Sequence, residues 1–173
     1  MEVPDLIKID QIRNRGFRPQ VVGCFINDKK VLFLFKKEHN LWQLPQGGVN
    51  NKELLKTAFF REMAEELGSD FIKTVKKNIQ IFGEDEVKFP SRNQNTRELR
   101  NDADQDIYMK GKKYFFITTS SASQNIDITK TEFDDFKWLS FEDGLSLCDT
   151  ILQKGKKRIT TKALKELRNL NLI

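Results

Sequence analysis

Two apolar, β-rich runs at residues 21–26 and 31–35, separated only by the four residues NDKK, constrain the fold more than any other feature of the sequence. Runs of this kind with so short a connection predict a β-hairpin. The segment LWQLP that follows is expected to be a short extended piece. Next to it, Gly47 and Gly48 are expected to let the chain turn tightly.

The rest of the chain alternates between predicted helices and strands. Apolar periodicity and the terminator Gly68 predict a helix over residues 51–67, and residues 141–152 and 160–170 also have helical patterns. Further strands are expected at residues 79–82, 114–119 and 136–139. A length of 173 residues fits one domain, spanning residues 1–173. This order of elements predicts an α/β or α+β sandwich.

One long segment, residues 90–111, is polar and shows no periodicity. It is long for a connection inside a compact domain. Two interpretations stay open for this loop insertion: it is mobile, or it faces a substrate.

The helix predicted over residues 51–67 changes character along its length. Its first half carries apolar residues at helical spacing, whereas the second half, REMAEELG, continues that stripe through Glu62, Glu65 and Glu66. At 100° per residue these three carboxylates fall within roughly 100° of arc. Carboxylates clustered beside a core repel one another and lose hydration, and a hard cation such as Mg²⁺ or Mn²⁺ relieves both costs. We therefore expect a metal site on this face, with a solvated acidic face as the alternative.

Composition limits the kinds of partner and metal site that this protein can have. The formal net charge of +5 favours polyanionic partners, although a compositional habit of the source explains it equally well. Cys24 and Cys148 are too few for a zinc cluster, and the single histidine, His39, excludes a multi-histidine metal site. The N-terminus does not resemble a signal peptide, and no segment has the roughly 18 apolar residues of a membrane span. We expect a cytoplasmic protein whose chemistry depends on carboxylates.

Gly47, Glu53 and the octet REMAEELG stand at the spacings of a known motif and resemble the Nudix box over residues 47–69. Ser69 departs from it, in a position that is usually aliphatic. The resemblance implies a Nudix fold, with a mixed β-sheet sandwiched between α-helices. It also implies a hydrolase that uses two or three Mg²⁺ or Mn²⁺ ions to cleave a nucleoside diphosphate linked to another group.

The same resemblance assigns roles within the box. It implies that Glu62, Glu65 and Glu66 bind the metal ions, with Gly47 as a further ligand. Glu65, Glu66 and Arg61 are the expected catalytic residues, and Arg61 is expected to orient the neighbouring carboxylates.

Two further box residues are expected to have structural roles. Glu53 lies nine residues before Glu62, about 180° around a helix, which places it outside the ligand cluster. It is expected to steady the loop of residues 47–52 and the helix N-terminus, where negative charge is favourable. Gly68 is expected to end the helix.

The outer segments resemble a subgroup of the family. GFRPQVVG, WQLPQGGV, GKKYFFI and TEFDDFKWLS are similar, in the same order, to segments of bacterial RNA pyrophosphohydrolases and diadenosine polyphosphate hydrolases, over about residues 16–170. The resemblance implies that Glu132 is a further metal ligand or catalytic base. It implies substrate binding by the following residues: Arg18, Lys36, Gln46 and Lys156.

One departure from the subgroup concerns the terminal base. Its RNA-processing members carry an aromatic pair where this chain has Val87 and Gly155. Because base stacking contributes about 1–3 kcal/mol per base, the loss either weakens binding or transfers it to another aromatic residue. Phe89 and Tyr108 are the candidates.

The predicted function is hydrolysis of 5′-triphosphate or diphosphate RNA ends to monophosphates. The expected partner is thus a nucleoside polyphosphate at an RNA 5′ end, with no membrane and no obligate protein partner. Three alternatives stay open: a dinucleoside polyphosphate hydrolase, a broad-specificity enzyme for nucleotide sugars or ADP-ribose, and a non-catalytic Nudix module that binds RNA or a nucleotide.

Overall fold

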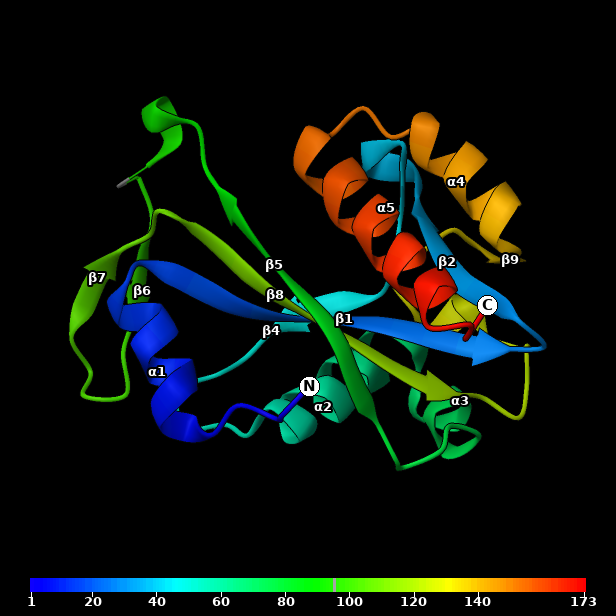
Figure 1. Cartoon of the computed structure of the whole chain (residues 1–173), viewed down its shortest axis with the longest axis horizontal. Coiled ribbons are helices and arrows are strands. Elements are labelled where there is room, and N and C mark those ends of the chain that lie inside the picture. The colour runs from blue at the N-terminus through cyan, green and yellow to red at the C-terminus, as the bar shows by residue number, and fades with distance from the viewer. Residues whose placement is uncertain (95) are drawn as a thin grey trace.

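A mixed sheet forms the centre of the computed structural model, which describes residues 1–94 and 96–173 (Figure 1). Within that part of the chain the sheet has seven strands in the order β3-β2-β1-β8-β5, with β4 also pairing with β1 and β9 with β2. Its strands are β1 (Phe17–Asn27), β2 (Lys30–Lys36), β3 (Leu41–Gln43), β4 (Gln46–Gly48), β5 (Gln80–Lys88), β8 (Gly111–Ser120) and β9 (Asp135–Leu139). The α-helices are α1 (Leu6–Asn14), α2 (Leu55–Leu67), α3 (Ser69–Lys73), α4 (Phe141–Asp149) and α5 (Lys154–Asn169).

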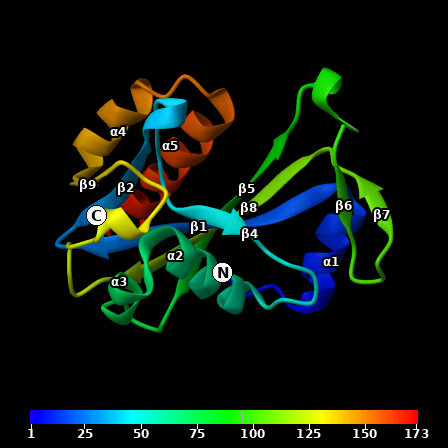
Figure 2. The ribbon, with the colours of Figure 1, turned by 180° about the vertical axis from the view of Figure 1, so that it is seen from behind.

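The first two strands separate soon after their hairpin. Asp28 and Lys29 have φ values of 48° and 56° at its turn, as the right-handed twist of a two-residue hairpin connection requires. β1 pairs with β2 only at the hairpin end, through Ile26 and Asn27. Further along, β4 pairs with β1 instead, and Gly47 lies opposite Val21 (Figure 2). The sheet therefore opens into a fork, and β4 lies inside it.

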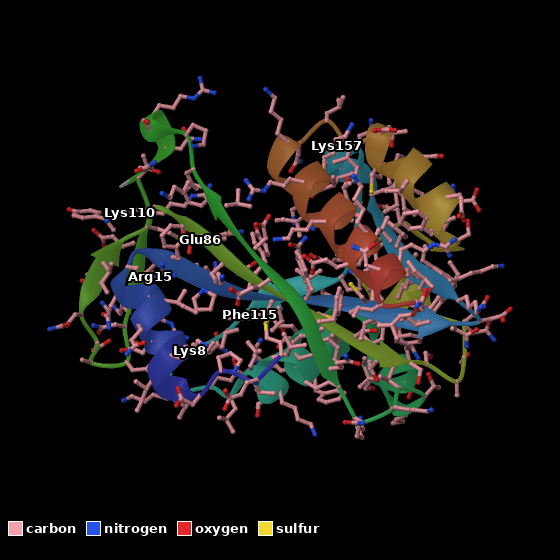
Figure 3. The ribbon with its side chains drawn as sticks, viewed as in Figure 1. Lys8, Arg15, Glu86, Lys110, Phe115 and Lys157 are labelled. Atoms are coloured by element: carbon pink, nitrogen blue, oxygen red, sulfur yellow. The ribbon has the colours of Figure 1, made fainter. Side chains whose placement is uncertain are left out.

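Helices cover both faces of this sheet. On one face α2 buries Phe59 and Met63 against Phe25 and Phe115. On the other face α5 buries Leu164 in a cluster that also contains Phe116. Alternate residues of β8 thus enter opposite cores, as strand geometry requires. Figure 3 shows Phe115 near the middle of the molecule and the exposed Lys8 at its periphery.

The predicted α+β architecture is confirmed, as are the hairpin, the later strands and the helices α4 and α5. The helix α2 begins at Leu55 rather than at residue 51. Gly47 and Gly48 do not form a tight turn: they belong to β4, because β1 pairs with them once it has separated from β2. The helices α1 and α3 were not predicted, since they have only nine and five residues.

The segment of residues 90–111 is more ordered than its sequence indicates. It contains the hairpin of β6 (Glu98–Arg100) and β7 (Asp106–Tyr108), although Asn95 lies outside the described residues. The hairpin is tied to α1, because the Asp102 amide donates to Asp10 Oδ1 at 2.7 Å. Among the described residues, no helix has the length and apolar content for crossing a membrane.

Candidate active site

Two carboxylates of α2 lie directly against β4. Gly47 has no side chain, and a Cβ atom there would overlap the carboxylate of Glu62. The neighbouring amide of Gln46 donates to Glu66 Oε2 at 2.8 Å. The extended backbone of β4 and the missing Cβ together bring both glutamates to one short strand.

The charged form of the Glu66 carboxylate is unfavourable in this position. Burial raises its pKa to about 8, and the neighbouring carboxylates of Glu132 and Glu62 act in the same direction. The Gln46 amide and Lys156 oppose this rise without cancelling it. A carboxylate with so little hydration is stabilised by any cation that comes to share its oxygen atoms.

Arg61 joins the acidic residues into one network. It donates to both oxygens of Glu53, at 2.8 and 2.7 Å, and to Glu62 Oε1 at 2.7 Å. It also donates to the backbone oxygen of Gly48 at 2.9 Å. The hydrogen bonds with Glu53 are the main reason that the pKa of Arg61 lies above its usual range. The guanidinium therefore fixes Glu62 relative to β4.

Glu53 lies before α2, so the helical angle used to separate it from Glu62 does not apply. Arg61 lies between the two carboxylates instead and bonds to each of them. Glu53 Oε2 also accepts from the amide of Asn50 at 2.8 Å, within the loop that precedes the helix. Gly68, at the other end of α2, has a φ of 84° and ends the helix as expected.

The three glutamates of the octet do not share one environment. The buried stripe of α2 continues through Met63 and Leu67, and Glu62 and Glu66 border it. The side chain of Glu65 is 61% exposed, with Oε1 3.5 Å from Arg61. The prediction that all three continue the apolar stripe is thus wrong for Glu65.

In the described part of the chain, no three acidic, histidine or cysteine side chains are close enough together to hold a metal ion as they stand. The donors nevertheless fit a divalent cation. Glu62 and the poorly hydrated Glu66 supply hard oxygen ligands from one helix, and Gly47 leaves its backbone accessible beside them.

Glu132 reaches the site from the segment before β9. Because β9 pairs with β2, Glu132 is brought beside Lys36, whose Nζ donates to Oε2 at 2.9 Å. That hydrogen bond is the main reason that the pKa of Lys36 is raised. The side chain of Glu132 is 58% exposed, so it is accessible to a ligand.

Lys156 approaches from the other face of the sheet. Its Nζ donates to Gln43 Oε1 at 2.9 Å, and the side-chain amide of Gln46 donates to the same oxygen at 3.1 Å. Burial lowers the pKa of Lys156 to about 8, and the nearby Lys112 lowers it further, against the opposing effect of Glu66. The buried Gln43 was not predicted as a site residue, although its position in WQLPQGG was a usable signal.

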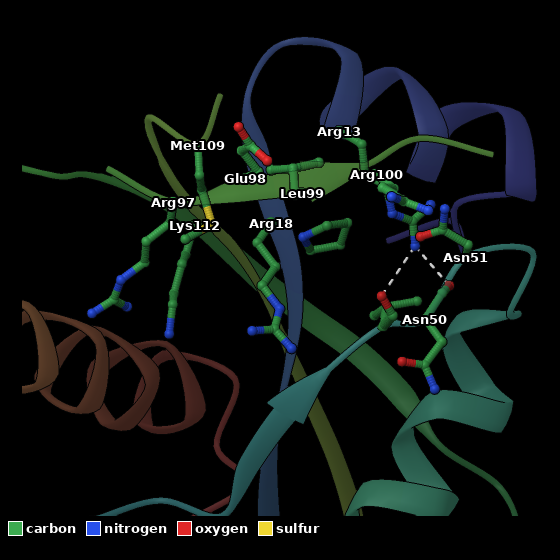
Figure 4. A pocket seen from close by; sticks show the side chains of 12 residues that line it. Arg13, Arg18, Asn50, Asn51, Arg97, Glu98, Leu99, Arg100, Met109 and Lys112 are labelled. Atoms are coloured by element: carbon green, nitrogen blue, oxygen red, sulfur yellow. Dashed lines mark hydrogen bonds between the residues drawn. The ribbon is translucent and has the colours of Figure 1, made fainter. Parts of the chain in front are cut away.

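Two cavities flank these residues. The first, of about 280 Å³, is lined by the predicted Arg18 and by Arg97 and Lys112, which sequence reasoning missed (Figure 4). A Cβ atom on Gly48 would lie 2.7 Å from Arg18 Nη2, so the missing side chain gives the guanidinium room over β4.

The second cavity, of about 590 Å³, lies between the end of β5 and the start of α5. Val87 and Gly155 both line it, at the positions where the subgroup has its aromatic pair. Phe89 also lines this cavity, whereas Tyr108 on β7 does not. Of the two candidate aromatics, Phe89 is the one within reach of a ligand there.

The protein has an α+β fold in which a mixed sheet lies between helices. The glutamates of α2 lie against β4, which contains Gly47 and Gly48, at the fork of the sheet. A family model described as the NUDIX domain matches residues 17–161, and the chain belongs to the Nudix family. Nudix hydrolases generally use divalent metal ions.

Curated relatives and solved structures agree with this membership. The chain is 34% identical over 136 residues to the RNA pyrophosphohydrolase of Haemophilus ducreyi, covering 73% of this chain and 64% of that protein. It is 30% identical to the RNA pyrophosphohydrolase of Acinetobacter baylyi, with 75% and 77% covered. The matched part thus spans less than two thirds of the first relative. A Nudix hydrolase from Nitrosomonas europaea has a similar fold, with a TM-score of 0.61, 12% identity, and 88% and 89% covered.

Proposed function

We propose that this protein hydrolyses a phosphoanhydride bond in a nucleoside polyphosphate and converts 5′-triphosphate or diphosphate RNA ends to monophosphates. The observation that carries the proposal is the buried carboxylate of Glu66 beside Glu62, with Lys156 opposite. Acidic groups for cations and basic groups for phosphates meet there within one site. The similarity to two RNA pyrophosphohydrolases supports RNA as the substrate.

The metal ions of the proposal are two or three Mg²⁺ or Mn²⁺ ions. Glu62, Glu66 and the backbone of Gly47 would hold them, and the exposed Glu65 and Glu132 would complete the set. Divalent ions bound there would offset the charge on phosphate oxygens and acidify a water molecule.

The side chains around these donors have separate tasks. Arg61 holds Glu62 in place and the Gln46 amide holds Glu66, so both are oriented before a substrate arrives. If one of Glu65, Glu66 and Glu132 is left free of the metal ions, its carboxylate would accept the proton of the attacking water. The cationic groups that would bind phosphate oxygens are those of Arg18, Lys36 and Lys156.

The activity is tested with a panel of substrates and one matched pair of variants. Purified protein with Mg²⁺ or Mn²⁺ is given a short 5′-triphosphorylated RNA, diadenosine tetraphosphate, ADP-ribose and a nucleotide sugar. Pyrophosphate or phosphate release from the RNA should dominate. Glu66→Gln should lower kcat by at least about 100-fold. The control Glu142→Gln changes a glutamate whose side chain is 71% exposed on α4, and it should be as active as the wild type.

Each alternative predicts a different result in this panel. Much faster consumption of diadenosine tetraphosphate would assign the protein to the dinucleotide hydrolases. Dominant turnover of ADP-ribose or the nucleotide sugar would indicate a broad-specificity enzyme. Tight binding of RNA without turnover would indicate a non-catalytic module, and unchanged activity of Glu66→Gln would reject its metal role.

The terminal base is proposed to stack on Phe89 in the larger cavity. Phe89 lines this cavity with Lys156, and its backbone amide is fixed by a 2.8 Å hydrogen bond to the oxygen of Lys110. Phe89→Ala should weaken RNA binding by about 1–3 kcal/mol, measured as a rise in KM. Tyr108→Ala is the control, because this exposed aromatic lies outside the cavity. A larger effect at Tyr108 would reverse the assignment.

A further inference from the structure

Arg97 and Lys112 line both cavities beside the candidate active site. We propose that they form a subsite for the first internucleotide phosphate of a single-stranded RNA, one nucleotide beyond the reacting end. This inference rests on the proposed function for its substrate class, and it adds the recognition of a phosphodiester by the β6–β7 hairpin segment.

The register of the sheet places like charges side by side at this point. Arg18 of β1 and Lys112 of β8 are Cα partners in a parallel pair, so their side chains leave the same face of the sheet as neighbours. Like charges opposite each other reduce the stability of a sheet. A bound anion would offset that cost.

Burial adds to the cost of this arrangement. Burial lowers the pKa of Lys112, and the charges of Arg18 and Arg97 lower it further. In the described part of the chain, Arg18, Arg97 and Lys112 take part in none of the ion pairs with carboxylates. Figure 4 shows the three side chains extending toward the same space. A cluster of cations without acidic partners is suited to an external anion.

Arg100 on the same hairpin provides a contrast. Its guanidinium lies 2.9 Å from Asp106 and 3.1 Å from Asp104, so its charge is already compensated. Arg100 lines the smaller cavity, but its charge is less available than that of Arg97 to an external anion. In the described part of the chain, Arg100 is thus paired with carboxylates, whereas Arg97, three residues earlier, is not.

The position of the cluster favours a phosphodiester over the reacting phosphates. Within the described chain no residue of α2 or α5 lines the smaller cavity, so the carboxylates of α2 and the side chain of Lys156 lie outside it, with Lys112 between this cavity and Lys156. The larger cavity, where the base is proposed to stack, shares Arg97 and Lys112 with it. A nucleotide whose base occupies the larger cavity would direct its 3′ phosphate toward these two side chains.

The hairpin is held firmly enough to place Arg97. The oxygen of Arg97 accepts from the amide of Met109 at 2.8 Å, and the side-chain amide of Asn51 donates to the oxygen of Asn101 at 2.6 Å. Because the base and the turn of the hairpin are both fixed, Arg97 lies beside β8 before any substrate binds.

A binding experiment tests the subsite without using catalysis. The probe is a fluorescent RNA tetramer with a 5′-monophosphate, which contains internucleotide phosphates but no anhydride, and the comparison ligand is a nucleoside 5′-monophosphate. Arg97→Ala and Lys112→Gln should each weaken tetramer binding about tenfold and leave the mononucleotide unchanged. Arg97→Ala should also reduce the salt slope of tetramer binding by about 0.7. Arg100→Ala should bind as the wild type does.

Three results would overturn the inference: undiminished tetramer binding by Arg97→Ala, equal losses for tetramer and mononucleotide, or an equal loss in Arg100→Ala. Thermal unfolding of each variant shows whether a loss reflects misfolding, and Lys112→Arg should restore binding. If the wild type binds the tetramer through Arg97 but releases no pyrophosphate from triphosphorylated RNA, the proposed function fails and the subsite stands. If it releases pyrophosphate but Arg97→Ala binds normally, only the subsite fails.

Discussion

At the scale of single residues, the site depends on the close approach of a helix carboxylate to the backbone of β4. Glu62 reaches β4 because Gly47 has no side chain, and Arg61 holds that glutamate while also bonding to Gly48 of β4. The position of the Glu62 carboxylate thus depends on the absence of a side chain at Gly47.

Gly47→Ala tests this dependence. The added Cβ would occupy the position of the Glu62 carboxylate, which would have to leave β4. We expect kcat to fall by about 10- to 100-fold, since displacement of a catalytic group by an ångström has effects of that size. Steady-state kinetics on triphosphorylated RNA measures this fall. Glu142→Gln is the control, because its side chain is 71% exposed on α4, and activity loss should be confined to Gly47→Ala.

Asp85 provides a pH-dependent prediction. Its side chain is only 6% exposed, and although burial raises its pKa, the hydrogen bond from Arg158 and the charge of Lys162 outweigh this and lower it overall. A lowered pKa in the folded state adds stability above the unfolded-state value, and this stability is lost as the pH falls through the folded-state value. Asp85→Asn should therefore cost about 2 kcal/mol at pH 7.

Urea unfolding of the wild type and Asp85→Asn at several pH values measures this cost. The difference in unfolding free energy should stay constant down to about pH 5 and shrink below about pH 4. A difference that grows on acidification would contradict the ion-pair explanation.

The site residues differ in how far the sequence predicts them. Glu62 and Glu66 follow from helical spacing and from the resemblance, because their geometry is local to one helix. The positions of Arg97, Lys112 and Gln43 depend on which strands pair and in what register, and local sequence patterns do not reveal that pairing. The apolar spacing of the first half of α2 predicts that Glu65 lies on the buried side. In the second half the buried stripe shifts toward Met63 and Leu67, so Glu65 is exposed.

At the scale of elements, α1 and the β6–β7 hairpin form a unit that the sequence pattern did not reveal. Arg13 of α1 has a side chain that is 3% exposed. It donates to the oxygens of Val49 and Asn50 at 3.0 and 2.6 Å, and it pairs with Asp102 at 3.2 Å. One buried guanidinium thus connects the first helix, the loop before α2 and the hairpin. Short polar segments gain their order from such tertiary contacts, so local propensity alone does not predict them.

Arg13→Ala should destabilise the fold by about 3 kcal/mol, because it leaves the buried carbonyl of Val49 without a partner and removes hydrogen bonds to Asn50 and Asp102. Arg15→Ala is the matched control on the same segment. Arg15 pairs with Glu86 at 3.0 Å but its side chain is 56% exposed, so its removal should cost less than about 1 kcal/mol. Denaturant titration compares the two, and equal costs would contradict the anchoring role of Arg13.

At the scale of the whole molecule, metal binding and folding should be coupled. The folded chain keeps a poorly hydrated carboxylate at Glu66, and a cation that binds only the folded state stabilises it. A metal concentration of 100 times Kd contributes about 2.7 kcal/mol. For a chain of this length we expect the midpoint of thermal unfolding to rise by several degrees with Mn²⁺.

Differential scanning fluorimetry with and without Mn²⁺ measures this rise. Glu66→Gln should lose most of it, and Glu142→Gln on the exposed face of α4 should keep it. If Mn²⁺ leaves the midpoint of thermal unfolding of the wild type unchanged, the proposed metal ligands are contradicted.

The fork of the sheet has a consequence for the motions open to this site. The segment around β4 is bonded to β1 throughout, since the amide of Gly23 donates to Pro45 and that of Val49 to Pro19, and β1 is itself paired with β8 over ten positions. Peeling β4 away would disrupt the centre of the sheet. The wall facing the glutamates should thus be among the slowest segments to exchange its amide protons with deuterium. Accommodation of substrates of different length then falls to the side chains of α2, the start of α5 and the β6–β7 hairpin.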